Sequence, residues 1–255
     1  MNEPSTHATE QLQRELAEAK AYQRAISDIL QIIRESPTDV TPVFQEIVQS
    51  CRRLFGSDES LAFLAREGQL HLVGYVGDHE AQAKSDYPRT LEGTISGLAI
   101  AQRAMIYRPS VAQSPDLPEY MRRTTESTGD FSMAIAPMLW QGQGIGTITI
   151  TCMPPREFSP EELSLLRTFA DQAVIAVQNA RLFQETQDAL ERQTATAEVL
   201  QVISRSPADV QPVFNAIAER AKQLCGATIG AVARYDGDWV HLVAFNGTSS
   251  AAEQL

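Results

Sequence analysis

This chain of 255 residues lacks several features that would tie it to membranes or nucleic acids. It has no apolar stretch approaching the roughly 18 residues that cross a bilayer. It also has no run of basic residues, and its formal net charge is −11. Nucleic-acid binding requires clustered Lys and Arg against the phosphates, and an acidic chain docks poorly on anionic lipid. We therefore expect no nucleic-acid partner and no membrane partner.

Cysteine is also scarce, with only Cys51, Cys152 and Cys225, which lie far apart in the sequence. Their number and spacing predict neither a disulfide framework nor a metal site, because metal ligation favours closely spaced Cys and His. The first 14 residues are polar and lack the basic and apolar regions of a signal peptide. These features favour a cytoplasmic protein with buried thiols and without a bound metal.

The strongest internal pattern is a repeat. Leu30–Phe44 returns as Leu200–Phe214, a constant offset of 170 residues, and Gly56 and Gly77 return as Gly226 and Gly247. The second copy has run through about a third of its unit at the last residue, too little to bury a core. We expect residues 205–255 to be the truncated start of a second domain. The chain is then a piece of a longer protein, with a natural full-length product as the alternative.

Long helices are predicted on both sides of the first copy. Residues 10–35 carry apolar positions at alternating spacings of three and four, which is the pattern of a coiled-coil seam. This predicts an N-terminal coiled-coil helix over 1–35; the alternative is a single helix packed on its own domain. The second helix starts at a capping box, Ser159 with Glu162, and continues as a connector over 160–204. The predicted seam residues are Leu12, Leu16, Ala19, Gln23, Ile26, Leu30 and Ile33.

Between these helices the pattern predicts a helix from Asp39 to about Leu54 and hairpins over 61–76 and 133–152. A short helix over 94–102 and a strand over 104–107 lie between the hairpins, and 115–128 reads as a polar loop with at most a short helix. Sequential hairpins build antiparallel sheets, so the predicted class is α+β, with a sheet flanked by helices.

Three segments resemble GAF domains of bacterial multi-domain sensor proteins: the helix over 169–183, the strand over 144–150, and residues 30–44, which resemble the start of such domains in sensor histidine kinases. The resemblance covers residues 25–184 fully and 196–255 partially. It implies a sensory domain over 36–184 with helices on one face of its sheet and a ligand pocket on the other. It also implies a parallel homodimer formed through the flanking helices, and a catalytic output domain elsewhere in the parent protein.

Enzymatic readings find little support in these residues. His79-Glu80 imitates a phospho-accepting histidine motif, but it follows a predicted strand end and reads as loop. Gly142, Gly144 and Gly146 have strands on both sides, so they predict a hairpin turn and not a phosphate loop. Relatives with a covalent bilin, and the GAF-fold methionine sulfoxide reductases, carry cysteines where this chain has none. We therefore expect a non-enzymatic domain without a covalent bilin.

The remaining possibility is a non-covalent pocket. By position in the family pattern, the expected lining residues are Tyr75, Ile95, Leu98, Tyr107, Arg108, Phe131 and Met133. Arg108 is the cation among them and could hold an anionic group; the alternative is an ordinary core with Arg108 at the surface. The leading hypothesis is a cytoplasmic sensory module of a bacterial sensor histidine kinase that binds a small molecule. A dimerisation spacer without a ligand is the alternative, and a GAF-fold redox enzyme is the weaker one.

Overall fold

The computed structural model describes residues 3–205 and 210–247. The chain divides into two compact units, Met1–Leu182 and Phe183–Leu255. No helix within the described ranges is long and apolar enough to span a bilayer. The first unit contains the candidate site.

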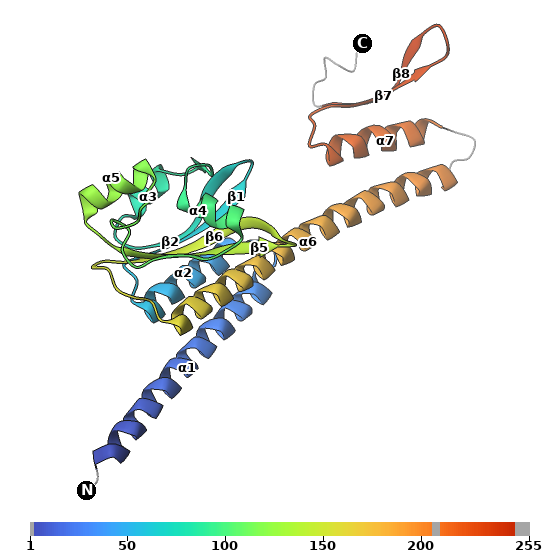
Figure 1. Cartoon of the computed structure of the whole chain (residues 1–255). Helices are drawn as coiled ribbons and strands as arrows, with labels where there is room; N and C mark the ends of the chain where they lie inside the picture. The colour runs from blue at the N-terminus through green and yellow to red at the C-terminus, as the bar shows by residue number, and fades with distance from the viewer. Residues whose placement is uncertain (1–2, 206–209, 248–255) are drawn as a thin grey trace. The chain divides into compact units, whose positions relative to one another are not determined.

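The first unit is built on a six-stranded antiparallel sheet, with strand order β3-β2-β1-β6-β5-β4 (Figure 1). Its central hairpins are β1–β2 and β5–β6. Each hairpin turns through two residues of positive φ, Glu67-Gly68 and Gln141-Gly142, as expected for tight two-residue turns. Both predicted hairpins and the α+β class are confirmed. The strands are β1 (Glu59–Arg66), β2 (Gln69–Val76), β3 (Arg89–Thr90), β4 (Ile106–Arg108), β5 (Ser132–Trp140) and β6 (Gln143–Cys152).

Helices cover both faces of this sheet (Figure 1). The helices α1 (Glu3–Glu35), α2 (Thr41–Phe55) and the first part of α6 (Pro160–Arg205) lie on one face. Three shorter helices lie on the other: α3 (Glu80–Ser85), α4 (Ile95–Gln102) and α5 (Glu119–Thr128). The predicted capping box opens α6: the Ser159 amide donates to Glu162 at 2.8 Å, and the Glu162 amide donates to Ser159 Oγ at 3.2 Å.

One of the three short helices, α3, differs from the sequence interpretation. Glu80 was expected in a loop, but it begins α3, where its ion pair with Lys84 spans 2.7 Å across one turn. The segment 115–128, expected to be a polar loop with at most a short helix, contains the ten-residue helix α5. Both helices are short and polar, so their place in the fold depends on the sheet beneath them and not on local hydrophobic periodicity.

Successive side chains along a strand point to opposite faces of the sheet, so the buried residues form two clusters, one on each face. Ala134 and Ile148 face α2 and α6, where they meet the buried rings of Phe44 and Phe169. Met133, the neighbour of Ala134, faces the opposite side of the sheet together with Ile135, Phe131 and residues of α4. The larger cluster therefore holds the long helices on the sheet, and the smaller one lies under the loops and short helices.

The helix α1 presents two different faces. Ala25, Ile29 and Ile33 are buried against their own domain, so its C-terminal half packs on the sheet unit, as the alternative interpretation expected. Leu16 remains 55% exposed and Leu30 40% exposed. Two residues of the predicted seam are covered within one chain: Ile33 is 7% exposed and Ile26 is half-buried. The side chain of Leu12 lies outside the described residues. The other four seam residues are exposed to solvent: Leu16, Ala19, Gln23 and Leu30.

The second unit contains the helix α7 (Gln211–Leu224) and the antiparallel hairpin of β7 (Gly230–Tyr235) and β8 (Val240–Asn246). Its local geometry repeats that of the first unit at the same offset of 170 residues. Gly226 and Gly56 both have φ of 59°, and the pairing irregularity at Val232/Ala233 matches the one at Ala62/Phe63. Residues 206–209 and 248–255 of the expected second copy lie outside the described residues.

Candidate functional site

The face of the sheet opposite α2 carries a cavity of about 560 Å³, within the range of small-molecule sites. It lies between strands β1, β2, β5 and β6 and the helices α3 and α5. Its apolar lining is rich in aromatic rings and thioethers and consists of Leu61, Phe63, Tyr75, Ala83, Tyr87, Tyr120, Met121, Phe131, Met133, Ile135 and Met153. Its polar and charged lining consists of Asp58, Glu59, Asp78, His79, Gln82, Asp86, Arg89, Ser96, Thr124, Ser127, Thr128, Thr149 and Thr151.

Arg89 stands between two aromatic rings of this lining. Its guanidinium carbon lies 5.4 Å from the ring centroid of Tyr87 and 5.0 Å from that of Tyr120, both within cation–π range. The Tyr87 ring also packs on Phe63, with centroids 4.6 Å apart. Burial raises the pKa of Tyr87 to about 12 and also raises the pKa of Tyr120, so both hydroxyls stay protonated near neutral pH.

The floor of the cavity carries a row of threonines from β6. Thr147 donates to Ser96 Oγ at 3.1 Å, which ties the sheet to α4. Thr149, two residues along the same face, is 5% exposed, and its Oγ1 has no hydrogen-bond partner among the described residues. A buried hydroxyl without a partner costs free energy, so this atom is suited to a hydrogen bond with a bound molecule.

Glu59 organises the rim of the cavity near the start of α3. The Tyr75 hydroxyl donates to Glu59 Oε1 at 2.8 Å, and the ring Nδ1 of His79 lies 2.8 Å from the same oxygen. The backbone amide of His79 in turn donates to the Tyr75 hydroxyl at 3.0 Å. Burial, and then the hydrogen bond to Glu59, raise the pKa of Tyr75. This network fastens the segment before α3 to the ends of β1 and β2.

The seven residues expected at the pocket separate into three groups, of which the third is Tyr107 alone. Tyr75, Phe131 and Met133 line the cavity. Ile95 is buried in the core beside it, Leu98 is 42% exposed on α4, and Arg108 lies at the end of β4; none of these three is among the described lining residues.

Tyr107 lies outside the candidate site, because the register between β4 and β5 places its side chain on the other face of the sheet. It pairs with Ala134, which faces the long helices. Its hydroxyl accepts a hydrogen bond from the Phe158 amide at 3.0 Å, and its ring packs against Phe158.

Sequence reasoning missed the residues with the clearest polar roles, Arg89 and Thr149. The alternation of Thr and Ile over 147–151 was an available signal, since it marks a strand whose second face is polar. No comparable signal connects Tyr87 and Arg89 with Tyr120, which lies on a separate helix. This cluster exists only through tertiary contacts.

None of the three cysteines is among the described residues that line the cavity. Cys51 and Cys152 are buried in the cluster beneath the long helices, and Cys225 is exposed in the second unit. Burial raises the pKa of the Cys51 and Cys152 thiols, which disfavours the reactive thiolate. Over residues 3–205 and 210–247, no group of three or more His, Cys, Asp or Glu is placed to hold a metal ion.

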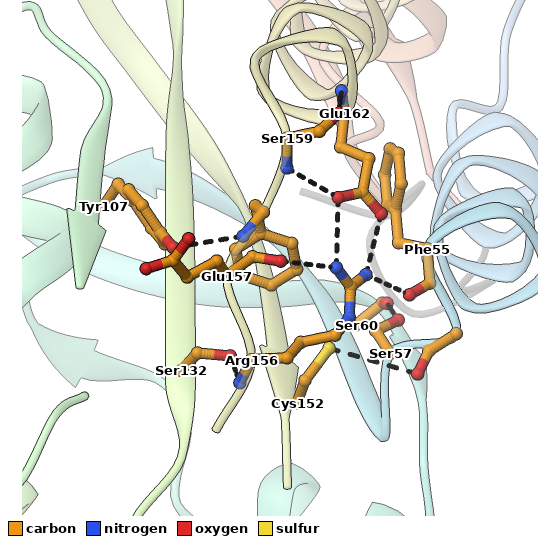
Figure 2. Close-up of polar contacts among 12 residues, drawn as sticks. Phe55, Ser57, Ser60, Tyr107, Ser132, Cys152, Arg156, Glu157, Ser159 and Glu162 are labelled. Atoms are coloured by element: carbon orange, nitrogen blue, oxygen red, sulfur yellow. Dashed lines mark hydrogen bonds and ion pairs between the residues drawn. The ribbon is translucent and has the colours of Figure 1, made fainter. Parts of the chain in front are cut away.

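A polar cluster around Arg156 joins the end of β6 to α6 and α2 (Figure 2). The guanidinium donates to both carboxylate oxygens of Glu162, at 2.8 and 3.0 Å, and also to the backbone carbonyl of Phe55. It further donates to the Glu157 carbonyl at 2.9 Å and lies 4.6 Å from the Phe158 ring centroid. Arg156 lies in the segment between β6 and α6, and its side chain therefore fastens that segment to the first turn of α6 and to the end of α2.

Comparisons with known proteins place this fold. A family model described as GAF domain matches residues 39–177, more than half of the chain. The GAF domain of a phosphoenolpyruvate-protein phosphotransferase from Coxiella burnetii is 17% identical, with a TM-score of 0.56 over 66% of this chain and 98% of its own. A methyl-accepting chemotaxis protein fragment (residues 122 to 287) is 20% identical, with a TM-score of 0.52 over 61% and 98%.

An enzyme has a similar structure. The free methionine-R-sulfoxide reductase from Neisseria meningitidis is 16% identical, with a TM-score of 0.52 over 64% of this chain and 93% of its own. At such identities the likeness shows the fold and leaves the ligand open. No curated protein matches the sequence.

Proposed function

The chain belongs to the GAF domain family, and from that premise we propose that residues 36–184 form a sensory domain that binds a small molecule non-covalently. The observation that carries this proposal is the cavity with its unpartnered Thr149 hydroxyl. The volume of the cavity is within the range of small-molecule sites, and its lining combines aromatic rings with polar groups that can orient a ligand. The domain itself is then a receptor and not an enzyme.

The parent protein in this proposal is a cytoplasmic bacterial signalling protein of the sensor histidine kinase type. The resemblance of residues 30–44 supports this context, as does the likeness to a chemotaxis protein. Residues 205–255 would belong to a second GAF domain, and the matching glycine φ values and pairing irregularities at the 170-residue offset support that assignment.

The proposed signal leaves through α6. A ligand that contacts Thr149 on β6 would bias the position of this strand. The segment that follows the strand leads directly to α6, and there Arg156 contacts Glu162 of α6 and the Phe55 carbonyl of α2. The ligand can shift the packing of α6 only by its difference in affinity for the two arrangements.

Native mass spectrometry of the full chain, purified without refolding, tests ligand binding. We expect a defined extra mass on the wild-type protein and its loss from Met133→Trp, because the larger side chain occupies the cavity that Met133 lines. Met105→Trp, at a half-buried position that does not line the cavity, is the control and should keep the mass. If no compound is retained and none from a metabolite library binds the wild-type protein, the receptor proposal is rejected in favour of a spacer.

The second candidate function is dimerisation, favoured by the exposed Leu16 and Leu30 on one side of α1. We expect the full chain to be a parallel dimer. Leu16→Asp should make it a monomer, because the two α1 helices of the dimer would then place two carboxylates opposite each other in their shared seam. Ala17→Asp adds the same charge at an exposed position off the predicted seam and should leave the dimer intact. Light scattering coupled to size exclusion measures the mass, and a monomeric wild-type protein would refute the seam.

The redox alternative is not favoured, because the described lining of the cavity contains no thiol and the Cys51 and Cys152 thiols are buried beneath the long helices. Thiol-dependent reduction of free methionine sulfoxide by the full chain would reverse this assignment.

A further inference from the structure

The chemistry of the cavity lining narrows the class of ligand, and Arg89 is the group that does so. Its backbone is fixed in β3, where it pairs with Leu70 of β2. Its closest carboxylate oxygen, Asp86 Oδ2, lies at 4.0 Å, the outer limit of an ion pair. No hydrogen bond from the guanidinium is found within residues 3–205 and 210–247. Arg89 therefore presents a rigid planar fork with free donor capacity beside the cavity, and such a fork suits a carboxylate.

The acidic residues of the lining limit how much negative charge a ligand can carry. Four carboxylates surround one arginine and one histidine, so the lining is net negative. These carboxylates already have partners: Met153 N donates to Asp58, Tyr75 and His79 contact Glu59, Gln82 donates to Asp86, and Arg52 lies 3.7 Å from Asp78. A polyanion such as a nucleotide would be repelled by these groups, whereas a single carboxylate can reach Arg89.

The rest of the ligand must match aromatic walls. Phe63, Tyr87, Tyr120 and Phe131 all line the cavity, and the first two pack on each other with centroids 4.6 Å apart. Aromatic rings stack favourably on planar apolar groups. Thr149 Oγ1 adds one further hydrogen-bonding position on the floor. An apolar planar body with one polar ring atom would satisfy both features.

We infer that the cavity binds a small monocarboxylate with an aromatic body, whose carboxylate is held by Arg89 and whose ring lies among Phe63, Tyr87 and Tyr120. The inference deepens the proposed receptor function and rests on it. Arg89 is the specificity-determining residue, a role for which Arg108 was one of two alternatives considered from the sequence.

The test compares three indole compounds on the full wild-type chain by isothermal titration calorimetry. Indole-3-acetate carries the carboxylate, indole-3-acetamide replaces it with a neutral isostere, and tryptamine places a cation on the same ring. We expect the acid to bind at least tenfold more tightly than the amide, and tryptamine to bind more weakly than the amide. Equal affinities for acid and amide, or tighter binding of tryptamine, would overturn the inference.

Variants assign the effect to named residues. Arg89→Gln should remove the preference for the acid, and Arg89→Lys should restore only part of it, because a point charge cannot form the two-pronged contact. Arg66→Gln is the matched control, since Arg66 is exposed at the end of β1 and does not line the cavity. Thr149→Val should weaken the acid and the amide alike. If Arg89→Gln fails to fold by circular dichroism, the wild-type comparison of acid with amide decides.

The outcomes separate this inference from the receptor proposal. Acid and amide binding equally, with both lost in Met133→Trp, would leave the receptor function standing and refute the role of Arg89. No binding of any indole at millimolar concentration would refute the aromatic monocarboxylate class, while a compound retained in native mass spectrometry would still support a receptor of different specificity.

Discussion

Replacing Gly146 with alanine should lower the free energy of unfolding of the first unit by about 3 kcal/mol. Gly146 pairs with Leu64 on one side and Met138 on the other, in the centre of the sheet. A Cβ at this position would lie 2.1 Å from the Phe63 carbonyl oxygen and 2.2 Å from Met138 Cε. The methionine can rotate away, but the carbonyl belongs to β1, so the strand itself would have to move.

Gly74→Ala provides the graded comparison for Gly146→Ala. A Cβ at Gly74 would lie 3.0 Å from the Phe44 carbonyl oxygen, so a shift of a few tenths of an ångström relieves the contact. We expect a loss of about 1 kcal/mol there. Urea unfolding followed by Trp140 fluorescence in a Trp239→Phe background reports on the first unit alone. Equal losses at the two glycines would contradict the steric argument.

Arg156→Met should cost about 2 kcal/mol and should loosen the first turn of α6. The substitution keeps much of the apolar stem but leaves Glu162 and the Phe55 carbonyl without their guanidinium partner (Figure 2). Glu162 is 16% exposed and Arg156 35% exposed, so water replaces the lost contacts only in part. Urea unfolding gives the free energy of unfolding, and hydrogen exchange of the backbone amides of residues 161–166 gives the local effect on α6.

Arg123→Met is the matched control for Arg156→Met. Arg123 pairs with Glu119 at 3.1 Å on the surface of α5, with side-chain exposures of 75% and 65%. Exposed pairs of this kind contribute little, so the expected change is within about 0.5 kcal/mol. If both variants lose the same small amount of stability, the Arg156 contacts contribute no more than an exposed ion pair, and the proposed route from β6 to α6 lacks an energetic basis.

Together, the two variants would test separate requirements of the receptor proposal. Gly146 concerns how closely β6 can approach β1, and hence the shape of the cavity floor. Arg156 concerns whether movement of that strand reaches the helix. A receptor with an intact cavity and an uncoupled helix would still bind its ligand but would fail to transmit the binding event.

Turns and helix starts, which depend on residues close together in the chain, could be predicted from the sequence by itself. The turn signals at Glu67-Gly68 and around Gly142-Gln143-Gly144 predicted both hairpins and hence the antiparallel sheet; the structure places the second turn at Gln141-Gly142, where both residues have positive φ. Ser159 and Glu162 lie three residues apart, and their reciprocal hydrogen bonds fixed the start of α6 in the sequence as in the structure. These signals work because every atom that they involve lies within a few residues.

The tertiary structure alone decided which face of the sheet or helix each side chain occupies and which distant residues it contacts. The pairing of Tyr107 with Ala134 turned Tyr107 toward the long helices, because strand register is set by a partner strand distant in sequence. The stripe of apolar residues on α1 could not reveal that Ala25 and Ile29 would pack on their own domain. Arg89 meets Tyr120 across 30 residues of intervening chain, through packing that no local pattern encodes. The fold class could thus be predicted from short-range chemistry, whereas the composition of the cavity required the folded chain.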